Sequence, residues 1–234
     1  MKTKKLFVVV FTLFLVGNVF ASTVKEKRET GSFTKISVES GVDLYFTQAN
    51  SKLIEVEADD KIITNVITVV EDNTLVVKVK KTRLFGNNKT IKVYVTYPEI
   101  KEVNVSGGAD FYCKELNCGS TFILNASGGA DAEIKNLLAG NNVKINTSGG
   151  ADIEINSLKS PNCTLSASGG GDIEATVTIS DILEINASGG ADISVKGQTK
   201  SLNVNASGGA DIHIKNLSYS SINSNKSGGA DIHK

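Results

Sequence analysis

Apolar and polar residues alternate with a period of two over most of the chain beyond residue 105. In VKINTSGGADIEI, residues 143–155, the odd-numbered positions are Val, Ile, Thr, Gly, Ala, Ile and Ile. The even-numbered positions are Lys, Asn, Ser, Gly, Asp and Glu, and residues 183–195 and 202–214 repeat the alternation. Because successive side chains of a strand point to opposite faces, this pattern predicts β-strands with one buried face.

The alternation belongs to a repeated unit marked by the pentapeptide SGGAD. Six copies read SGGAD and one, at 168–172, reads SGGGD; the copies begin at Ser106, Ser127, Ser148, Ser168, Ser188, Ser207 and Ser227. Their spacing of 19 to 21 residues is typical of one coil of a β-solenoid. A leucine-rich repeat has a similar period, but its Leu-x-x-Leu-x-Leu frame is missing.

The variable half of the unit predicts a third side to the coil. Leucine recurs there at one offset, at Leu116, Leu137, Leu158 and Leu217. We therefore expect an all-β fold, a three-sided parallel β-helix with about 20 residues per coil and about 4.8 Å between coils. Within each pentapeptide we expect Ala and Gly to face a narrow interior, and Ser and Asp to face water.

The repeat is weaker at residues 22–105, which we expect to form less regular N-terminal coils below the regular coils of 106–234. Residues 38–45 form a degenerate unit. Strands are predicted at 54–58, 74–80 and 89–97, and a strand or a short helix at 64–70. The prediction is one domain, 22–234, whose N-terminal part caps the solenoid against edge-to-edge association.

Residues 1–21 have the pattern of a secretory signal peptide. Lysines precede the apolar run 6–16, and Val19-Phe20-Ala21 is a small-residue cleavage pattern. The run is too short to span a membrane, and no cysteine follows it that could carry a lipid. We expect an exported protein without a membrane span, located in the periplasm, at the cell surface or outside the cell.

Charge disfavours a nucleic-acid partner. The chain has 25 basic and 25 acidic residues, and removal of residues 1–21 leaves 22 basic residues and 25 acidic ones. Arginine occurs only at Arg28 and Arg83, so bidentate phosphate recognition is not expected in the repeat half. The Gly-Gly pairs lack the Lys-Ser/Thr that completes a phosphate loop.

The chain has three cysteines, an odd number that excludes a complete disulfide framework. Cys113 and Cys163 occupy offsets where other units have Ile, Val or Leu, so we expect both to be buried apolar residues. Cys118 is the one expected to be exposed.

The aspartates of the repeat form the candidate binding site, a predicted outward-facing column of Asp110, Asp131, Asp152, Asp172, Asp192, Asp211 and Asp231. Carboxylates about 5 Å apart repel by about 1 kcal/mol in a water-like dielectric. Backbone N–H groups, serine hydroxyls, raised pKa values or bound cations could offset this repulsion. Calcium is the alternative, but the glycine frame and nine-residue period of calcium-binding β-rolls are absent. We therefore expect a structural column without metal or cofactor.

Two further polar patterns carry alternatives. His213 and His233 share an offset with Glu133, Glu154, Glu174 and Ser194, which favours an exposed polar column over a metal site. Asn-x-Ser triplets resemble glycosylation acceptors, but the repeat favours a hydrogen-bonded asparagine ladder; they begin at Asn104, Asn125, Asn146, Asn186 and Asn205.

Several stretches resemble one known family. They are FTKISV at 33–38, SGVDL at 40–44, VEADD at 56–60, NTLVV at 73–77 and IKVYVTYPEI at 91–100, which leads into the first SGGAD. In this order they resemble the auto-transporter adhesin head GIN domain family of exported proteins of Bacteroidetes, over about 30–234. The resemblance implies a right-handed β-helix and an envelope or extracellular location, and it supplies no catalytic residue.

The sequence thus favours a non-catalytic, adhesin-like binding module that presents polar ladders to a glycan or to an envelope or host protein. The alternatives are a polysaccharide-degrading β-helix enzyme and a self-assembling structural protein of the envelope. An enzyme is disfavoured because glycoside hydrolysis needs a distinguished pair of carboxylates, whereas the repeat has seven equivalent acids. The ligand and the oligomeric state are not specified by the sequence.

Overall fold

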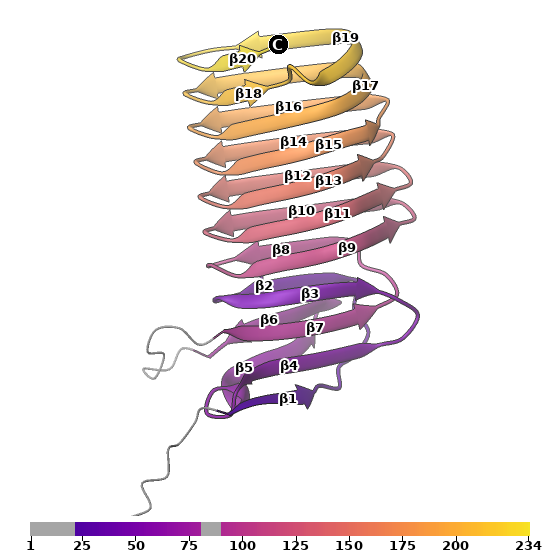
Figure 1. Cartoon of the computed structure of the whole chain (residues 1–234), viewed down its shortest axis with the longest axis vertical. Helices are drawn as coiled ribbons and strands as arrows, with labels where there is room; N and C mark the ends of the chain where they lie inside the picture. Colours follow the sequence, from indigo (N-terminus) through magenta and orange to yellow (C-terminus); the bar gives the residue numbers. More distant parts are fainter. Residues whose placement is uncertain (1–21, 81–89) are drawn as a thin grey trace, which may run out of the picture.

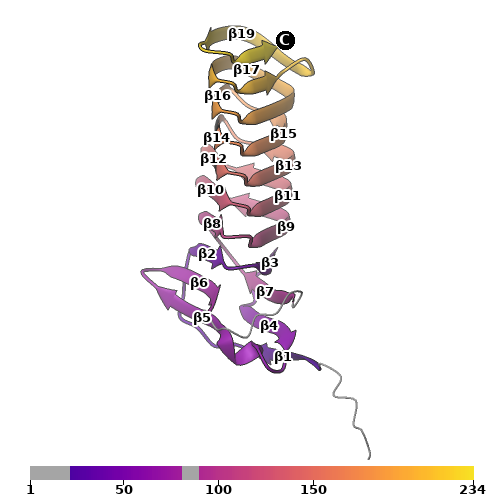
Figure 2. The same ribbon diagram turned by 90° about the vertical axis from the view of Figure 1, so that its left-hand side faces the viewer.

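The computed structural model describes residues 22–80 and 90–234, so the predicted signal peptide lies outside the described residues. The described chain forms twenty β-strands and one short 3-10 helix. Figures 1 and 2 show coils stacked along one long axis, with the N-terminal elements at one end and the C-terminal coil at the other. This stack of about seven turns confirms the predicted parallel β-solenoid.

Each regular coil contains two strands joined by the SGGAD turn, and equivalent residues of neighbouring coils pair in parallel, as Ser127 pairs with Ser148 and Asp131 with Asp152. The strands before the turn are β8 (Glu102–Ser106), β10 (Thr121–Gly128), β12 (Asn142–Gly149), β14 (Asn162–Gly169) and β16 (Ile182–Gly189). The strands after it are β9 (Asp110–Cys118), β11 (Asp131–Ala139), β13 (Asp152–Lys159) and β15 (Asp172–Ile179). The stack ends with β17 (Asp192–Gly208), which serves both rows, and then β18 (Asp211–His213), β19 (Leu217–Lys226) and β20 (Asp231–His233).

The predicted third side is present as a corner within the strands after the turn, where the alternation of buried and exposed residues shifts by one position. In β11 two consecutive residues, Lys135 and Asn136, are exposed, and burial resumes at Leu137. The predicted leucines are all buried and stack in register with Val177 and Gly197; they are Leu116, Leu137, Leu158 and Leu217. The recurring leucine therefore fills the interior behind this corner.

The SGGAD turn is tighter than the alternation alone suggests. Ala126 and Ala130 are buried as expected, but Gly128 and Gly129 are exposed. The first glycine of the pair has a positive φ, +79° at Gly128, which is a backbone conformation that glycine adopts without strain. The expectation that the Gly-Gly pair faces the interior was therefore wrong: the pair forms the outer rim of the turn, and the alanines, or Gly171 in the SGGGD copy, face inward.

The N-terminal coils do not stack in sequence order. β2 (Lys35–Glu39) and β3 (Val42–Gln48) pair in parallel with β8 and β9 on one side. On the other side they pair with β6 (Thr74–Val79) and β7 (Ile91–Tyr97). The chain therefore doubles back below β2 and β3 before it rises into the regular coils, as Figure 1 shows.

Antiparallel strands complete this end of the stack. β1 (Thr23–Lys27) pairs with β4 (Leu53–Asp59), β4 pairs with β7, and β5 (Val66–Glu71) forms a hairpin with β6. The region predicted as strand or short helix contains both, since the 3-10 helix Ile63–Asn65 leads directly into β5. β1 was not predicted, although its half-buried alternation is the period-two signal of a strand.

One hydrophobic core runs through the stack and contains buried residues from Phe33 to Ala230 in the last coil. The large aromatic side chains Phe33, Phe111 and Phe122 are at most 1% exposed, so the interior is packed with side chains. Among the described residues, no helix has the length and apolar character needed to cross a membrane.

Candidate functional site

The predicted aspartates form a single column on the row of strands that follows the turn. Each lies in register with the aspartate of the next coil, from Asp110 to Asp231. Asp43 of β3 adds an eighth member below Asp110, and Lys92 of β7 lies below Asp43. The degenerate unit at 38–45 therefore belongs to the same column.

The carboxylates of this column affect one another. Desolvation is the largest cause that raises the pKa of Asp131, and the charge of Asp110 adds to it. Desolvation also raises the pKa of Asp152, followed by the charges of Asp172 and Asp131. Backbone N–H groups offset part of the repulsion: that of Asp192 donates to Oδ1 of Asp172 at 3.3 Å. Of the offsets predicted, the structure supplies backbone donors and raised pKa values.

The raised pKa values predict a pH dependence of stability. Because Asp131 and Asp152 bind protons more readily when folded, the free energy of unfolding should rise as the pH falls from their raised pKa toward the ordinary 3.8. We expect Asp131→Asn or Asp152→Asn to stabilise the protein at neutral pH by about 0.5–1 kcal/mol. This gain should disappear below pH 3.8, where both states are protonated. Urea unfolding at the two pH values measures it.

The matched control for this prediction is Asp231→Asn at the end of the column. Asp231 has an aspartate on one side only, and Nζ of Lys226 lies 3.1 Å from its Oδ1. Removal of its charge should therefore give no stabilisation at neutral pH. An equal gain at Asp152 and Asp231, or no gain at Asp152, would contradict mutual repulsion as the cause.

A second outward column runs beside the aspartates and contains Tyr112, Glu133, Glu154, Glu174, Ser194, His213 and His233. An acidic groove of about 400 Å³ lies between the columns, over β11, β13 and β15. The rings of His213 and His233 stack 4.5 Å apart, and Nε2 of His233 lies 3.7 Å from Oδ1 of Asp211. Within the described ranges, no three His, Cys, Asp or Glu side chains gather as a metal site.

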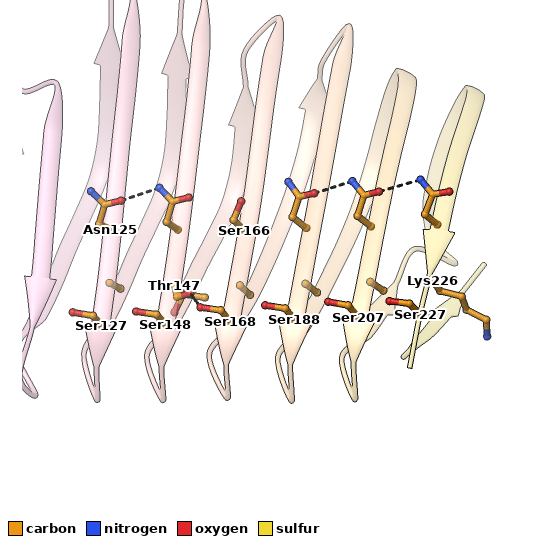
Figure 3. Close-up of a pocket in the computed structure, with 18 residues that line it drawn as sticks. Asn125, Ser127, Thr147, Ser148, Ser166, Ser168, Ser188, Ser207, Lys226 and Ser227 are labelled. Atoms are coloured by element: carbon orange, nitrogen blue, oxygen red, sulfur yellow. Dashed lines mark hydrogen bonds between the residues drawn. The ribbon is translucent and has the colours of Figure 1, made fainter. Parts of the chain in front are cut away.

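The strands before the turn carry the predicted asparagine ladder on their outer face (Figure 3). Nδ2 of Asn125 donates to Oδ1 of Asn104 at 2.8 Å, and Nδ2 of Asn146 donates to Oδ1 of Asn125 at 2.8 Å. A second run has the same polarity, from Asn205 to Asn186 at 2.9 Å and from Asn225 to Asn205 at 3.2 Å. The first asparagine of each run donates to a glutamate two residues earlier, Glu102 or Glu184.

A groove of about 670 Å³ lies between this ladder and the parallel column of pentapeptide serines. Its walls are outward-facing amides and hydroxyls, and its floor lies over the alanines between them. Lys226, at the C-terminal end, is the one charged side chain among the residues that line it. The groove crosses six coils, from β10 to β19, with the same pair of polar groups in nearly every coil.

Two substitutions interrupt this regularity in adjacent coils. Ser166 of β14 replaces the asparagine between Asn146 and Asn186, which separates the two amide runs. Thr147 of β12 replaces an alanine of the floor; it is 3% exposed, and its hydroxyl donates to the carbonyl oxygen of Ala151. A methyl group on Gly171 would lie 2.8 Å from Oγ1 of Thr147. The deviating SGGGD copy is thus explained by the extra volume of Thr147.

The three cysteines are buried free thiols. Burial is the first cause of their raised pKa values, about 12 for Cys113 and Cys118 and about 11 for Cys163, so none is a reactive thiolate at neutral pH. The expectation for Cys113 and Cys163 is confirmed, whereas that for Cys118 was wrong. Cys118 follows the corner, where the alternation has changed phase, and it stacks inward with Ala139.

The sequence predicted the asparagine ladder and the aspartate column, but not the groove between the asparagines and the serines. The asparagine and the serine of each Asn-x-Ser triplet lie two residues apart on one strand, so both point outward. That spacing was the available signal for a channel between two ladders. Its depth depends on the small residue between them, which the turn holds inward.

Comparisons with known proteins agree with this architecture. The model of a family described as "Putative auto-transporter adhesin, head GIN domain" matches residues 32–157 and 138–233. A search of curated proteins finds no match.

Solved structures of Bacteroidetes proteins share the fold. A "putative adhesin" from Parabacteroides distasonis is 18% identical, with a TM-score of 0.73 over 91% of this chain and 97% of that one. A "putative adhesin" from Bacteroides fragilis is 21% identical, with a TM-score of 0.66 over 88% and 96%. A "putative lipid binding protein" from Parabacteroides distasonis is 20% identical, with a TM-score of 0.67 over 91% and 96%.

At these identities the solved structures show the fold alone, whereas the family model matches nearly all of the described chain. Together with the SGGAD coils and the stacked polar columns, that match is decisive: the chain belongs to the auto-transporter adhesin head GIN domain family.

Proposed function

We propose that this protein is an exported, non-catalytic binding module of adhesin type, at the cell envelope or secreted, and that its Asn–Ser groove binds an extended neutral polysaccharide. The observation that carries the proposal is the groove itself. It repeats an outward amide and an outward hydroxyl at nearly every coil, about 4.8 Å apart along the axis. A regular lattice of this kind matches a polymer that repeats its own hydroxyl groups.

The hydrogen-bonding capacity of the groove supports a sugar ligand. An asparagine side chain has two N–H donors and one carbonyl acceptor, and the ladder uses only one donor of each. Within the described residues, the second donor remains available to a ligand. So do the hydroxyls of the pentapeptide serines in the groove, except that of Ser168, which donates to the carbonyl oxygen of Thr147 at 3.5 Å. The near absence of charge along the groove favours a neutral polymer over an acidic one or a nucleic acid.

Three rival functions make different predictions. A polysaccharide-degrading enzyme would use carboxylates of the Asp or Glu column, and would release sugar ends. A lipid ligand would contact the alanines of the floor and the aliphatic parts of the walls, and would leave the amides and hydroxyls without partners. The column from Asp110 to Asp231, which we first expected to be the binding surface, stays a prediction and is the third rival.

The test is a binding panel of immobilised neutral and acidic polysaccharides and lipid vesicles, with matched variants from one coil. Ser188 lines the groove, whereas Ser194 points outward on the opposite row of strands six residues later. We expect Ser188→Gln to weaken polysaccharide binding at least tenfold, because the longer side chain occupies the groove. Ser194→Gln should leave binding within twofold.

Other outcomes of the panel would contradict the proposal. Loss of binding on Asp152→Asn with Ser188→Gln unaffected would assign recognition to the Asp column. Release of reducing ends would show an enzyme, and binding restricted to vesicles would show a lipid ligand. Binding to none of the polysaccharides would overturn the proposed ligand class.

A further inference from the structure

The break in the asparagine ladder leaves a space the size of one carboxamide. Ser166 lies in register with Asn146 on one side and Asn186 on the other. A serine side chain ends at its hydroxyl, so the amide group that would continue the ladder is missing from this coil. The gap spans two coil spacings, about 10 Å, which is too far for Asn146 and Asn186 to bond directly.

Both neighbours of the missing amide retain a free hydrogen-bonding group. Oδ1 of Asn146 accepts no hydrogen bond from the described residues, although its Nδ2 donates to Asn125. Nδ2 of Asn186 donates one N–H to Glu184 at 3.0 Å and has a second N–H to give. The hydroxyl of Ser166 likewise has no partner among the described residues. In Figure 3 the dashed bonds of the ladder stop on either side of Ser166.

We propose that this notch, formed by Asn146, Ser166 and Asn186, binds the acetamido group of an N-acetylated sugar residue in the polysaccharide. The inference rests on the proposed function, since it names the ligand class for the same groove. A secondary amide has one N–H and one carbonyl oxygen. Its N–H would donate to Oδ1 of Asn146, and its carbonyl would accept from Nδ2 of Asn186.

The polarity of the ladder supports this occupant. In both runs each amide donates toward the preceding coil, so a ligand amide in the notch would bond in the same direction on both sides. A hydroxyl alone is too short to bridge the two neighbours. An ammonium group has no acceptor for Asn186, and a carboxylate has no donor for Asn146.

The notch also positions a repeating polymer along the groove. Each of the remaining coils from β10 to β19 offers an asparagine and a serine, so a polymer could slide by one coil and keep the same contacts. The missing amide makes one coil different. One acetamido group held there would fix the register of the rest of the chain.

The experiment uses oligomers of N-acetylglucosamine, the same oligomers after deacetylation, and glucose oligomers of equal length and linkage. The wild-type protein should bind the N-acetylated oligomer at least tenfold more tightly than either of the others. Ser166→Asn fills the notch with the protein's own amide, so it should lower this affinity at least tenfold, to the level of the glucose oligomer. Its melting temperature should stay the same or rise, because it joins the two amide runs.

Two further variants distinguish the effect of filling the notch from the effect of losing the Ser166 hydroxyl or of adding an amide elsewhere. Ser166→Ala keeps the notch open and should lose less than fivefold, because it removes only the hydroxyl. Thr164→Asn adds the same side chain two residues earlier, outside the groove, and should bind as the wild type does. Competition by a peptide amide as strong as that by the N-acetylated oligomer would assign the notch to a peptide and overturn the sugar.

The outcomes distinguish the two levels of the proposal. If the wild type binds the glucose oligomer as well as the N-acetylated one, or if Ser166→Asn binds within twofold of the wild type, the proposed acetamido site is contradicted. The proposal that the groove binds a polysaccharide is then unaffected. If none of the oligomers binds and Ser188→Gln changes nothing on the polysaccharide panel, both fall.

Discussion

Replacement of Gly197 by alanine should destabilise the protein by about 4 kcal/mol and lower its melting temperature by about 10 °C. Gly197 has φ of +111°, a backbone conformation that costs other residues about 1–3 kcal/mol. A Cβ atom there would lie 1.9 Å from the carbonyl oxygen of Val177, and that contact requires the backbone of one coil to move.

The repeat explains why a glycine stands at this position. Gly197 occupies the column of Leu116, Leu137 and Leu158 on the third side of the solenoid. The coil from Ser188 to Ser207 has the shortest spacing, 19 residues, and β17 runs through its corner without a break. The short coil brings its backbone so close to Val177 that no side chain fits.

Gly119→Ala is the matched control, since an added Cβ there meets no atom within 4 Å. It should change the stability by less than about 0.5 kcal/mol. Thermal unfolding followed by circular dichroism compares the two variants. Equal melting temperatures for the two variants would contradict the assigned corner geometry.

Gly171→Ala should cost about 1–3 kcal/mol in the wild-type protein but not in a Thr147→Ala background. The added methyl would lie 2.8 Å from Oγ1 and 3.1 Å from Cγ2 of Thr147, inside a closed core. In the double variant the pair becomes two alanines, the arrangement of Ala167 and Ala191 in the next coil.

A double-mutant cycle measures this coupling. Thr147→Ala alone should lose about 1 kcal/mol, for the buried hydrogen bond to the carbonyl oxygen of Ala151 and the removed methyl. That carbonyl still accepts from the backbone N–H of Asp172, so it is not left unpaired. We expect a coupling energy of about 1–2 kcal/mol from urea unfolding. Strict additivity of the two substitutions would show that the SGGGD copy is unrelated to Thr147.

Period and alternation predicted the features that repeat. Stacking a 20-residue unit places Asp131 on Asp152 and Asn125 on Asn146, because parallel coils in register align equal offsets. The buried Leu137 followed from the recurrence of leucine at one offset. These predictions needed no knowledge of the interior beyond its being apolar.

Features that depend on a change of phase or on long-range stacking were not predictable in this way. Cys118 was misplaced because two exposed residues at the corner shift the alternation before it. The insertion of β2 between β6 and β8, and of β3 between β7 and β9, joins segments that are far apart in the sequence. Alternation describes each strand but does not determine which strand lies beside it.

At the candidate site, too, the sequence reveals the changes but not their structural consequences. The Asn-to-Ser change at Ser166 is visible in the sequence, and so is the Ala-to-Gly change at Gly171. Their surroundings in the structure distinguish them. Gly171 avoids a contact with Thr147, whereas Ser166 leaves Oδ1 of Asn146 without a hydrogen-bond donor among the described residues. One deviation is thus a packing adjustment, and the other changes the lining of the groove.

We propose that the ligand binds in the Asn–Ser groove and not at the Asp column. The most direct measurement is a titration with N-acetylglucosamine oligomers followed by ¹H–¹⁵N NMR correlation spectra, in which side-chain amides are observed separately from backbone amides. We expect the Nδ2 signals of Asn146 and Asn186 to shift, while the backbone signals of Asp131 and Asp152 stay in place. Shifts confined to Asp131 and Asp152, or no shift of any asparagine side chain, would contradict it.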